Sequence, residues 1–277
     1  MDPAAPSFLA EPAGGRVYVS RRLVRSTDVT SSGRLRLDAL ARYLQAVAED
    51  DLADSGLLAP AVWLVRRCAV EIARLPAMGE RITLRTFCSG TGPRWAERTT
   101  TVTGSTGELL QARAVWAAIS PASGRPVPLD DGFLRVYGEA AGGRIASARL
   151  SHPRPAASDR GRRWPLRAAD FDTAGHVNNA IAWAAVEDLL AGEDPLADGS
   201  GPARAEVEYH RAIMPGCQPR LAAAGDEQEL IMWLLAGGRV LASARYRAGG
   251  LSATPQKMAR DPSLSARSTS SAPQRPA

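Results

Sequence analysis

The stretch EVEYHRAIMPGC (residues 206–217) repeats, with changes, the stretch AVEIARLPAMGE (residues 69–80). Their gapless alignment places identical residues opposite one another: Val70 with Val207, Glu71 with Glu208, Arg74 with Arg211 and Gly79 with Gly216. A second pair follows in the same order, GELLQARAVW (residues 107–116) and GGRVLASARY (residues 237–246). An internal repeat of this length predicts that the two halves of the chain share one fold.

Each half contains the same order of predicted elements, which is a strand, one long helix and then a run of strands. The first half has strands at 16–29, 62–75, 80–90, 94–104 and 108–120, with an apolar helical stripe over 34–56 formed by Leu37, Leu40, Ala41, Leu44, Val47 and Ala48. The second half has strands at 162–172, 203–216, 217–225, 227–238 and 239–248, with a helix over 177–192. Each helix must bury its stripe, and the sheet is the surface available to cover it. The sequence therefore predicts an α+β fold in which each helix is wrapped by a curved antiparallel sheet, and in which pairing of the halves covers open sheet edges.

Composition divides the chain into five segments. Residues 1–15 are rich in Pro, Ala and Gly and are expected to be flexible, and residues 249–277 are expected to form a disordered tail. The folded halves are then 16–137 and 163–248, joined by a Gly/Ala/Ser/Pro-rich linker over 138–162. His152 lies in this linker and is expected to be solvated.

Charge and hydropathy exclude several classes of protein. The net charge is +5, but no run of five or more Lys or Arg is present, which argues against a nucleic-acid-binding protein. No apolar run approaches the roughly 18 residues of a membrane span. The three Cys match no metal motif, and their odd number favours a reducing compartment. Together with an N-terminus unlike a signal peptide, this predicts a cytoplasmic protein.

The stretch DFDTAGHVNN (residues 170–179) precedes the second predicted helix and contains one of only three His in the chain. Its counterpart in the first half is TSSGRLRL (residues 30–37), where Thr30 replaces Asp172 and Arg34 replaces His176. Only the second half therefore carries both an acid and an imidazole at this turn.

Together these segments resemble the acyl-ACP thioesterases of plants and bacteria, a double hotdog family. The resemblance rests on LDALARYLQAVAEDDL, WLVRRCAVEIARLPAMGERITLRTF, GELLQARAVWAAISPASGRPVPL, DFDTAGHVNNAIAW and VEYHRAIMPG, in the family's order over nearly all of residues 16–248. It implies that the N-terminal hotdog forms the acyl-chain cavity and that the C-terminal one carries the catalytic loop. The plant-type Asn and Glu positions are occupied by Ala174 and Ala212, so the resemblance carries over Asp172 and His176 alone.

The resemblance implies thioester hydrolysis, which needs an activated water or a nucleophile and a site for the oxyanion. Asp172 is the candidate base toward water, or the nucleophile itself, and His176 the assisting group. Gly175 allows a tight turn. Three further residues at the helix start are candidate positioning or oxyanion groups through their backbone N–H: Val177, Asn178 and Asn179.

Structural roles are the alternative interpretation of the same residues. Asp172 is also suited to an Asx turn, and Asn178 or Asn179 to capping the helix. Glu187 and Asp188 are assigned to the polar face of the second helix, with a contact to the site as the alternative. Gln45 on the first helix is a candidate for lining the pocket.

The expected function is release of a free fatty acid from acyl-ACP in fatty acid biosynthesis, with acidic acyl carrier protein as the partner and without a metal or organic cofactor. Arg side chains such as Arg66 and Arg67 are candidates for contacts with the carrier or its phosphopantetheine phosphate. The alternatives are an acyl-CoA thioesterase of the same fold, a hotdog hydratase or dehydratase, and a non-catalytic acyl-binding protein. The internal pairing makes a second chain unnecessary for a hotdog pair, and a homodimer remains open.

Overall fold

The computed structural model describes residues 8–57, 61–156, 160–190, 195–196, 202–225 and 229–248. The predicted tail at 249–277 and residues 1–7 of the predicted flexible segment lie outside these ranges. Residues 8–15 lie along the sheet, where the Leu9 N–H donates to the Gln111 side chain at 2.7 Å and the Leu9 carbonyl accepts from it at 2.9 Å. Among the described helices, none combines the length and apolar character needed to cross a bilayer.

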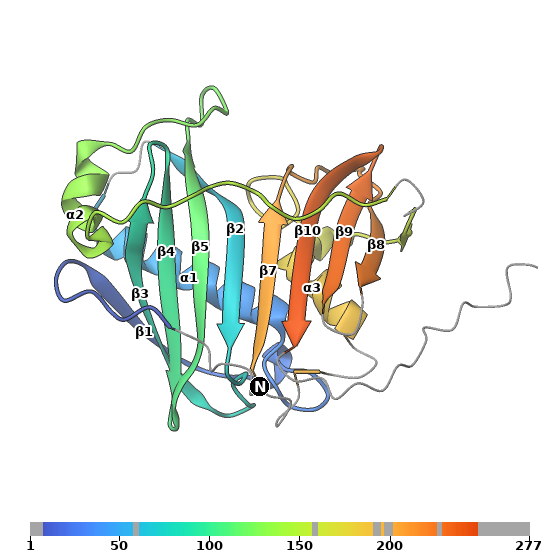
Figure 1. The fold of residues 1–277 in the computed structure, drawn as a ribbon, viewed down its shortest axis with the longest axis horizontal. Coiled ribbons are helices and arrows are strands. Elements are labelled where there is room, and N and C mark those ends of the chain that lie inside the picture. The colour runs from blue at the N-terminus through green and yellow to red at the C-terminus, as the bar shows by residue number, and fades with distance from the viewer. Residues whose placement is uncertain are drawn as a thin grey trace, which may run out of the picture.

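Ten strands of the described chain form one antiparallel sheet in the order β1-β3-β4-β5-β2-β7-β10-β9-β8-β6 (Figure 1). The first half contributes β1 (Val17–Leu23), β2 (Val62–Ile72), β3 (Arg81–Thr91), β4 (Trp95–Gly104) and β5 (Gly107–Ile119). The second contributes β6 (Arg162–Arg163), β7 (Ala203–Tyr209), β8 (Arg220–Gly225), β9 (Leu230–Ala236) and β10 (Arg239–Ala248). Each half has the same strand order counted outward from the β2–β7 seam, as expected for a repeat.

The aligned repeat positions make the same backbone contacts. The Arg74 N–H donates to the Leu109 carbonyl at 3.0 Å. In the second half the Arg211 N–H donates to the Leu241 carbonyl, also at 3.0 Å. The predicted alignment of Arg74 with Arg211 is therefore confirmed in space.

Two helices, α1 (Leu37–Asp54) and α3 (Ala180–Leu190), lie on one face of the sheet and contact each other (Figure 1). One continuous core joins the halves, and it includes four predicted stripe residues of α1: Leu37, Leu40, Leu44 and Val47. The predicted fold, a double hotdog in which each helix is covered by an antiparallel sheet, is confirmed.

A third helix, α2 (Asp131–Ala141), was not predicted from the sequence. Asp130 caps its start by accepting a hydrogen bond from the Phe133 N–H at 2.7 Å, and Gly142 ends it in the left-handed conformation with φ 57°. Residues 138–141, which composition assigns to the linker, form its last turn. The cap residue and the Phe133–Tyr137 spacing are signals that could have revealed this helix.

The strand predicted over 162–172 is largely wrong. Only Arg162–Arg163 pairs as a strand, and Ala168–Asp170 forms a 3-10 turn, η2. The Asp170 carboxylate accepts from the Arg167 N–H and from its guanidinium, both at 2.8 Å, so a local capping interaction replaces strand pairing. The equivalent turn in the first half, η1, spans Ser26–Asp28.

Residues 144–156, called the strap below, run from the end of α2 across the sheet face opposite the helices (Figure 1). Side chains of the sheet hold the backbone of the strap. Trp95 Nε1 donates to the Ala146 carbonyl at 2.9 Å, and Trp233 Nε1 donates to the Pro153 carbonyl at 2.8 Å. The connection between the halves is therefore fastened to the sheet at both ends.

Candidate active site

The loop before α3 brings Asp172 and His176 together. Asp172 Oδ1 lies 3.8 Å from His176 Nδ1, and the side chains are 28% and 30% exposed. The Asp172 N–H donates to the His176 carbonyl at 2.9 Å, and Gly175 has φ 79°, a conformation that favours glycine. Asp172 Oδ1 also accepts a hydrogen bond from the Ala174 N–H at 3.0 Å, so the structure contains the predicted Asx turn. The loop holds a carboxylate and an imidazole close together, and both are accessible.

The equivalent loop of the first half has the same backbone hydrogen bond, and its Arg34 side chain forms a buried ion pair. The Thr30 N–H donates to the Arg34 carbonyl at 2.8 Å, and Gly33 has φ 88°. Arg34 is 5% exposed and contacts both carboxylate oxygens of Glu187 on α3, at 2.9 and 3.1 Å. The assignment of Glu187 to the polar face of the helix is therefore wrong, because its charge is buried against this partner.

Two of the predicted oxyanion donors are already used. The Val177 N–H donates to the Ile213 carbonyl at 2.9 Å, and the Asn178 N–H donates to the Asp170 carbonyl at 2.8 Å. Asn178 Oδ1 accepts from the Ala180 N–H at 2.9 Å, which confirms the predicted capping role. The expectation of free amides at Val177 and Asn178 is thus wrong, since the loop needs both to hold its shape.

Asn179 remains available as a donor. Among the described residues, no group accepts a hydrogen bond from its backbone N–H. Its carbonyl accepts from Tyr209 Oη at 3.0 Å, and Tyr209 Oη accepts in turn from Trp183 Nε1 at 3.0 Å. Burial raises the pKa of Tyr209, so its phenol stays protonated and can donate. Tyr209 had no assigned role at the sequence level, although a Tyr on the core face of a strand needs a hydrogen-bond partner.

A cavity of about 390 Å³ is lined by this loop and by the first half. Asp172, His176 and Asn179 line it together with Gln45, as predicted for Gln45, and with Glu49 of the same helix. Most of the other lining residues are apolar or aromatic, including Ala48, Leu52, Trp63, Leu64, Trp116 and Phe133. The cavity has the composition of a site for an alkyl chain, with polar groups at the loop that carries Asp172 and His176.

A second, more polar cleft of about 180 Å³ is lined by the same loop. Arg66, Arg211 and His210 lie on its wall, and it shares Leu64, His176 and Asn179 with the larger cavity. The polar residues His176 and Asn179 therefore lie between a basic cleft and an apolar cavity.

Comparison with known proteins agrees with this architecture. Residues 15–137 match the family model for the acyl-ACP thioesterase N-terminal domain. An uncharacterized protein of Mycobacterium tuberculosis is 26% identical over 242 residues, which cover 87% of this chain and 96% of that protein.

Solved structures extend the likeness to both halves. An acyl-ACP thioesterase from Bacteroides thetaiotaomicron superposes with a TM-score of 0.69 at 19% identity, covering 83% of this chain and 97% of that one. The 12:0-ACP thioesterase from Umbellularia californica gives 0.67 at 17% identity, covering 84% and 97%. The resemblance predicted from the sequence is confirmed: residues 15–137 match an acyl-ACP thioesterase N-terminal domain, and the chain has the double hotdog fold of acyl-ACP thioesterases.

Proposed function

We propose that the protein hydrolyses acyl thioesters at the loop carrying Asp172 and His176, and that it releases free fatty acid from acyl-ACP in fatty acid biosynthesis. The observation that carries the proposal is the position of His176 and Asn179 between the basic cleft and the apolar cavity. A thioester joins a phosphopantetheine arm to an alkyl chain. The arm would occupy the cleft, the chain would occupy the cavity, and the thioester carbonyl would lie beside the loop.

Asp172 is the catalytic residue of this proposal. As a base, its carboxylate takes a proton from water while the water oxygen adds to the thioester carbonyl carbon. As a nucleophile, it forms a mixed anhydride with loss of the thiolate, and water then hydrolyses that anhydride. In both routes the C–S bond breaks and the departing sulfur acquires a proton. His176, 3.8 Å from the carboxylate, is placed to assist that transfer.

Asn179 is the oxyanion donor of the proposal, replacing the amides of Val177 and Asn178. Its backbone N–H lies at the start of α3, where a partial positive charge stabilises an anion. The hydrogen bond from Tyr209 holds the carbonyl of the same residue, so Tyr209 is a positioning residue.

Acyl carrier protein is the partner that best fits the cleft. Arg66 and Arg211 lie on its wall, and both an acidic carrier and the phosphate of its arm would be attracted to them. Acyl-CoA also carries phosphates, so a thioesterase acting on acyl-CoA is the second candidate.

The test is the Asp172→Asn variant assayed for thiol release on a panel of acyl-ACPs. Asn keeps the oxygen that accepts from the Ala174 N–H, so the turn survives while the base is lost. We expect kcat to fall by about 10² to 10⁴ with Tm unchanged. Asp188→Asn, on the exposed side of α3, is the matched control and retains full activity.

Two results would contradict parts of the proposal. Activity of Asp172→Asn equal to that of the wild type would remove Asp172 from the mechanism and leave the enzyme class intact. No thiol release by wild-type protein from any acyl-ACP or acyl-CoA, combined with acyl-chain binding, would identify a non-catalytic binding protein.

A further inference from the structure

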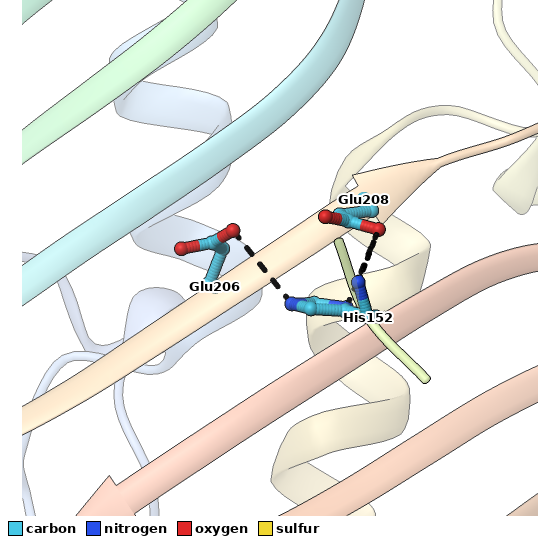
Figure 2. A group of neighbouring side chains, drawn as sticks. All are labelled: His152, Glu206 and Glu208. Atoms are coloured by element: carbon cyan, nitrogen blue, oxygen red, sulfur yellow. Dashed lines mark hydrogen bonds and ion pairs between the residues drawn. The ribbon is translucent and has the colours of Figure 1, made fainter. Parts of the chain in front are cut away.

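A buried cluster lies between the strap and β7, on the sheet face opposite α1 and α3. Figure 2 shows the imidazole of His152, from the strap, beside the carboxylates of Glu206 and Glu208, from β7. The His152 side chain is 1% exposed, so its predicted solvation is wrong. One donor atom from each of the three residues lies within 4.8 Å of the other two.

The ring nitrogens of His152 have unequal surroundings. Nδ1 lies 3.0 Å from Ser243 Oγ, which also lies 3.0 Å from His210 Nε2. The other nitrogen of His152, Nε2, is buried and has no hydrogen-bond partner among the described residues. It lies 3.7 Å from Glu206 Oε1, which is too far for a hydrogen bond.

Either proton arrangement leaves this nitrogen unsatisfied. When His152 Nδ1 donates to Ser243, the Nε2 lone pair faces Glu206 with no donor. When Ser243 donates instead, the Nε2–H has no acceptor within reach. A metal-binding histidine commonly donates its second N–H to an oxygen in this way, which orients the free lone pair toward the ion.

The two carboxylates of the cluster have few cationic partners, although the Glu208 carboxylate accepts from the backbone N–H groups of Ser151 and His152 at 2.5 and 3.1 Å. Glu208 is fully buried, and the basic side chains within 4 Å of it in the described structure are His152 and His210, each at 3.8 Å. Glu206 has one ionic partner with a fixed charge, Arg204, at 3.1 Å from its other oxygen. Arg204 is itself shared between Glu206 and Glu71, and Glu208 has no guanidinium partner among the described residues.

We propose that His152 Nε2, Glu206 and Glu208 bind one divalent transition-metal ion that fastens the strap to the sheet. Imidazole nitrogen with carboxylate oxygen is a donor set suited to Zn²⁺. Tetrahedral ligands about 2.1 Å from zinc stand about 3.4 Å apart, close to the 3.7 Å between His152 Nε2 and Glu206 Oε1. A water supplies the fourth ligand. The ion is structural, and the hydrolytic loop does not contribute to its site.

The test uses the full chain, expressed without a histidine tag and freed of metal with a chelator that is then removed. Titration with ZnCl₂ is followed by calorimetry and by Tm. We expect one ion per chain and a higher Tm when zinc is present, because the ion binds the folded state. Replacing zinc with Co²⁺ gives the intense visible bands of a four-coordinate ion, a readout on the wild type that does not depend on any variant folding.

Two variants locate the ion. Glu206→Gln is expected to weaken zinc binding by at least about tenfold. Glu71→Gln is the matched control, because Glu71 Oε1 pairs with the same Arg204 at 2.6 Å without belonging to the cluster, and its affinity stays at the wild-type value. Asp172→Asn also retains zinc, which separates this site from the proposed function. Absence of stoichiometric binding, a six-coordinate Co²⁺ spectrum, or equal losses in Glu206→Gln and Glu71→Gln would overturn the proposal.

Discussion

Asp172 and Thr30 occupy equivalent places in two loops with the same backbone hydrogen bonds. The side chains of the two loops have different surroundings. The loop with Asp172 keeps its acid and imidazole accessible at the cavity. The loop with Thr30 places Arg34 in the position of His176, and that guanidinium is buried against Glu187. One backbone turn therefore carries an accessible acid and imidazole in one copy and a buried ion pair in the other.

The two loop glycines allow these roles to be tested separately. Gly175 and Gly33 have φ values of 79° and 88°, and an added Cβ would meet nothing within 4 Å at either position. Gly175→Ala and Gly33→Ala should therefore each lower the unfolding free energy by about 1 to 2 kcal/mol, through backbone strain alone. Only Gly175→Ala should lower kcat, by about tenfold or more, because it shifts Asp172 and His176.

Urea unfolding and thiol release measure the two effects. Equal losses of activity in both glycine variants would show that strain in either loop, rather than the shape of the loop with Asp172 and His176, controls the rate.

At the scale of elements, the start of α1 depends on a residue of α3. Glu187 Oε1 accepts from the Leu37 N–H at 2.7 Å as well as from Arg34, so one carboxylate satisfies the first turn of one helix while lying on the other. Helical periodicity located the apolar stripes of both helices. It placed Glu187 outward because a charged residue is normally solvated, and the partner that reverses this lies 153 positions away.

Removing one member of the buried Arg34–Glu187 pair should strongly lower the free energy of unfolding. We expect Arg34→Met to lower the unfolding free energy by about 3 to 5 kcal/mol, because Glu187 is left buried without a counter-charge. The double variant Arg34→Met/Glu187→Met should recover most of that loss, since no charge remains buried. Arg85→Met, which breaks the exposed pair with Glu11, is the control and should cost less than about 1 kcal/mol.

Denaturant unfolding of the wild type, the two single variants and the double variant measures these differences. A double variant that is no more stable than Arg34→Met would mean that packing of the Arg34 stem, rather than charge, stabilises the junction.

At the scale of the whole molecule, the single sheet places the proposed chemistry where the halves meet. Pairing of β2 with β7 joins the ten strands into one sheet, and the strap crosses the sheet face opposite α1 and α3 (Figure 1). The cavity is lined by α1 and strands of the first half together with the loop of the second. Arg66 of the first half and Arg211 of the second both line the cleft. Neither half alone has both walls of the site.

Charge reversal in the cleft tests the proposed route of the carrier. Arg211 is exposed, and Arg211→Glu should raise KM for acyl-ACP by about tenfold at low salt while leaving kcat at saturation unchanged, because it affects association with an acidic partner. Added salt should reduce the difference from wild type. Arg81 is the exposed first residue of β3, toward the far edge of the sheet, and Arg81→Glu should change neither constant. An equal rise in KM for both variants would remove the cleft from carrier recognition.

The sequence by itself determined the repeat, the two long helices and the fold class, because these depend on local periodicity and on similarity between segments of one chain. It also singled out Asp172 and His176, since an acid and an imidazole replaced by Thr30 and Arg34 in the other copy are visible without coordinates. Whether an amide, a charge or an imidazole is free depends on partners distant in the chain. Only the tertiary structure showed that the amides of Val177 and Asn178 are occupied, that Glu187 is buried and that His152 is enclosed between two carboxylates. Hydrogen bonding and burial are properties of packed surfaces, and composition and spacing do not record them.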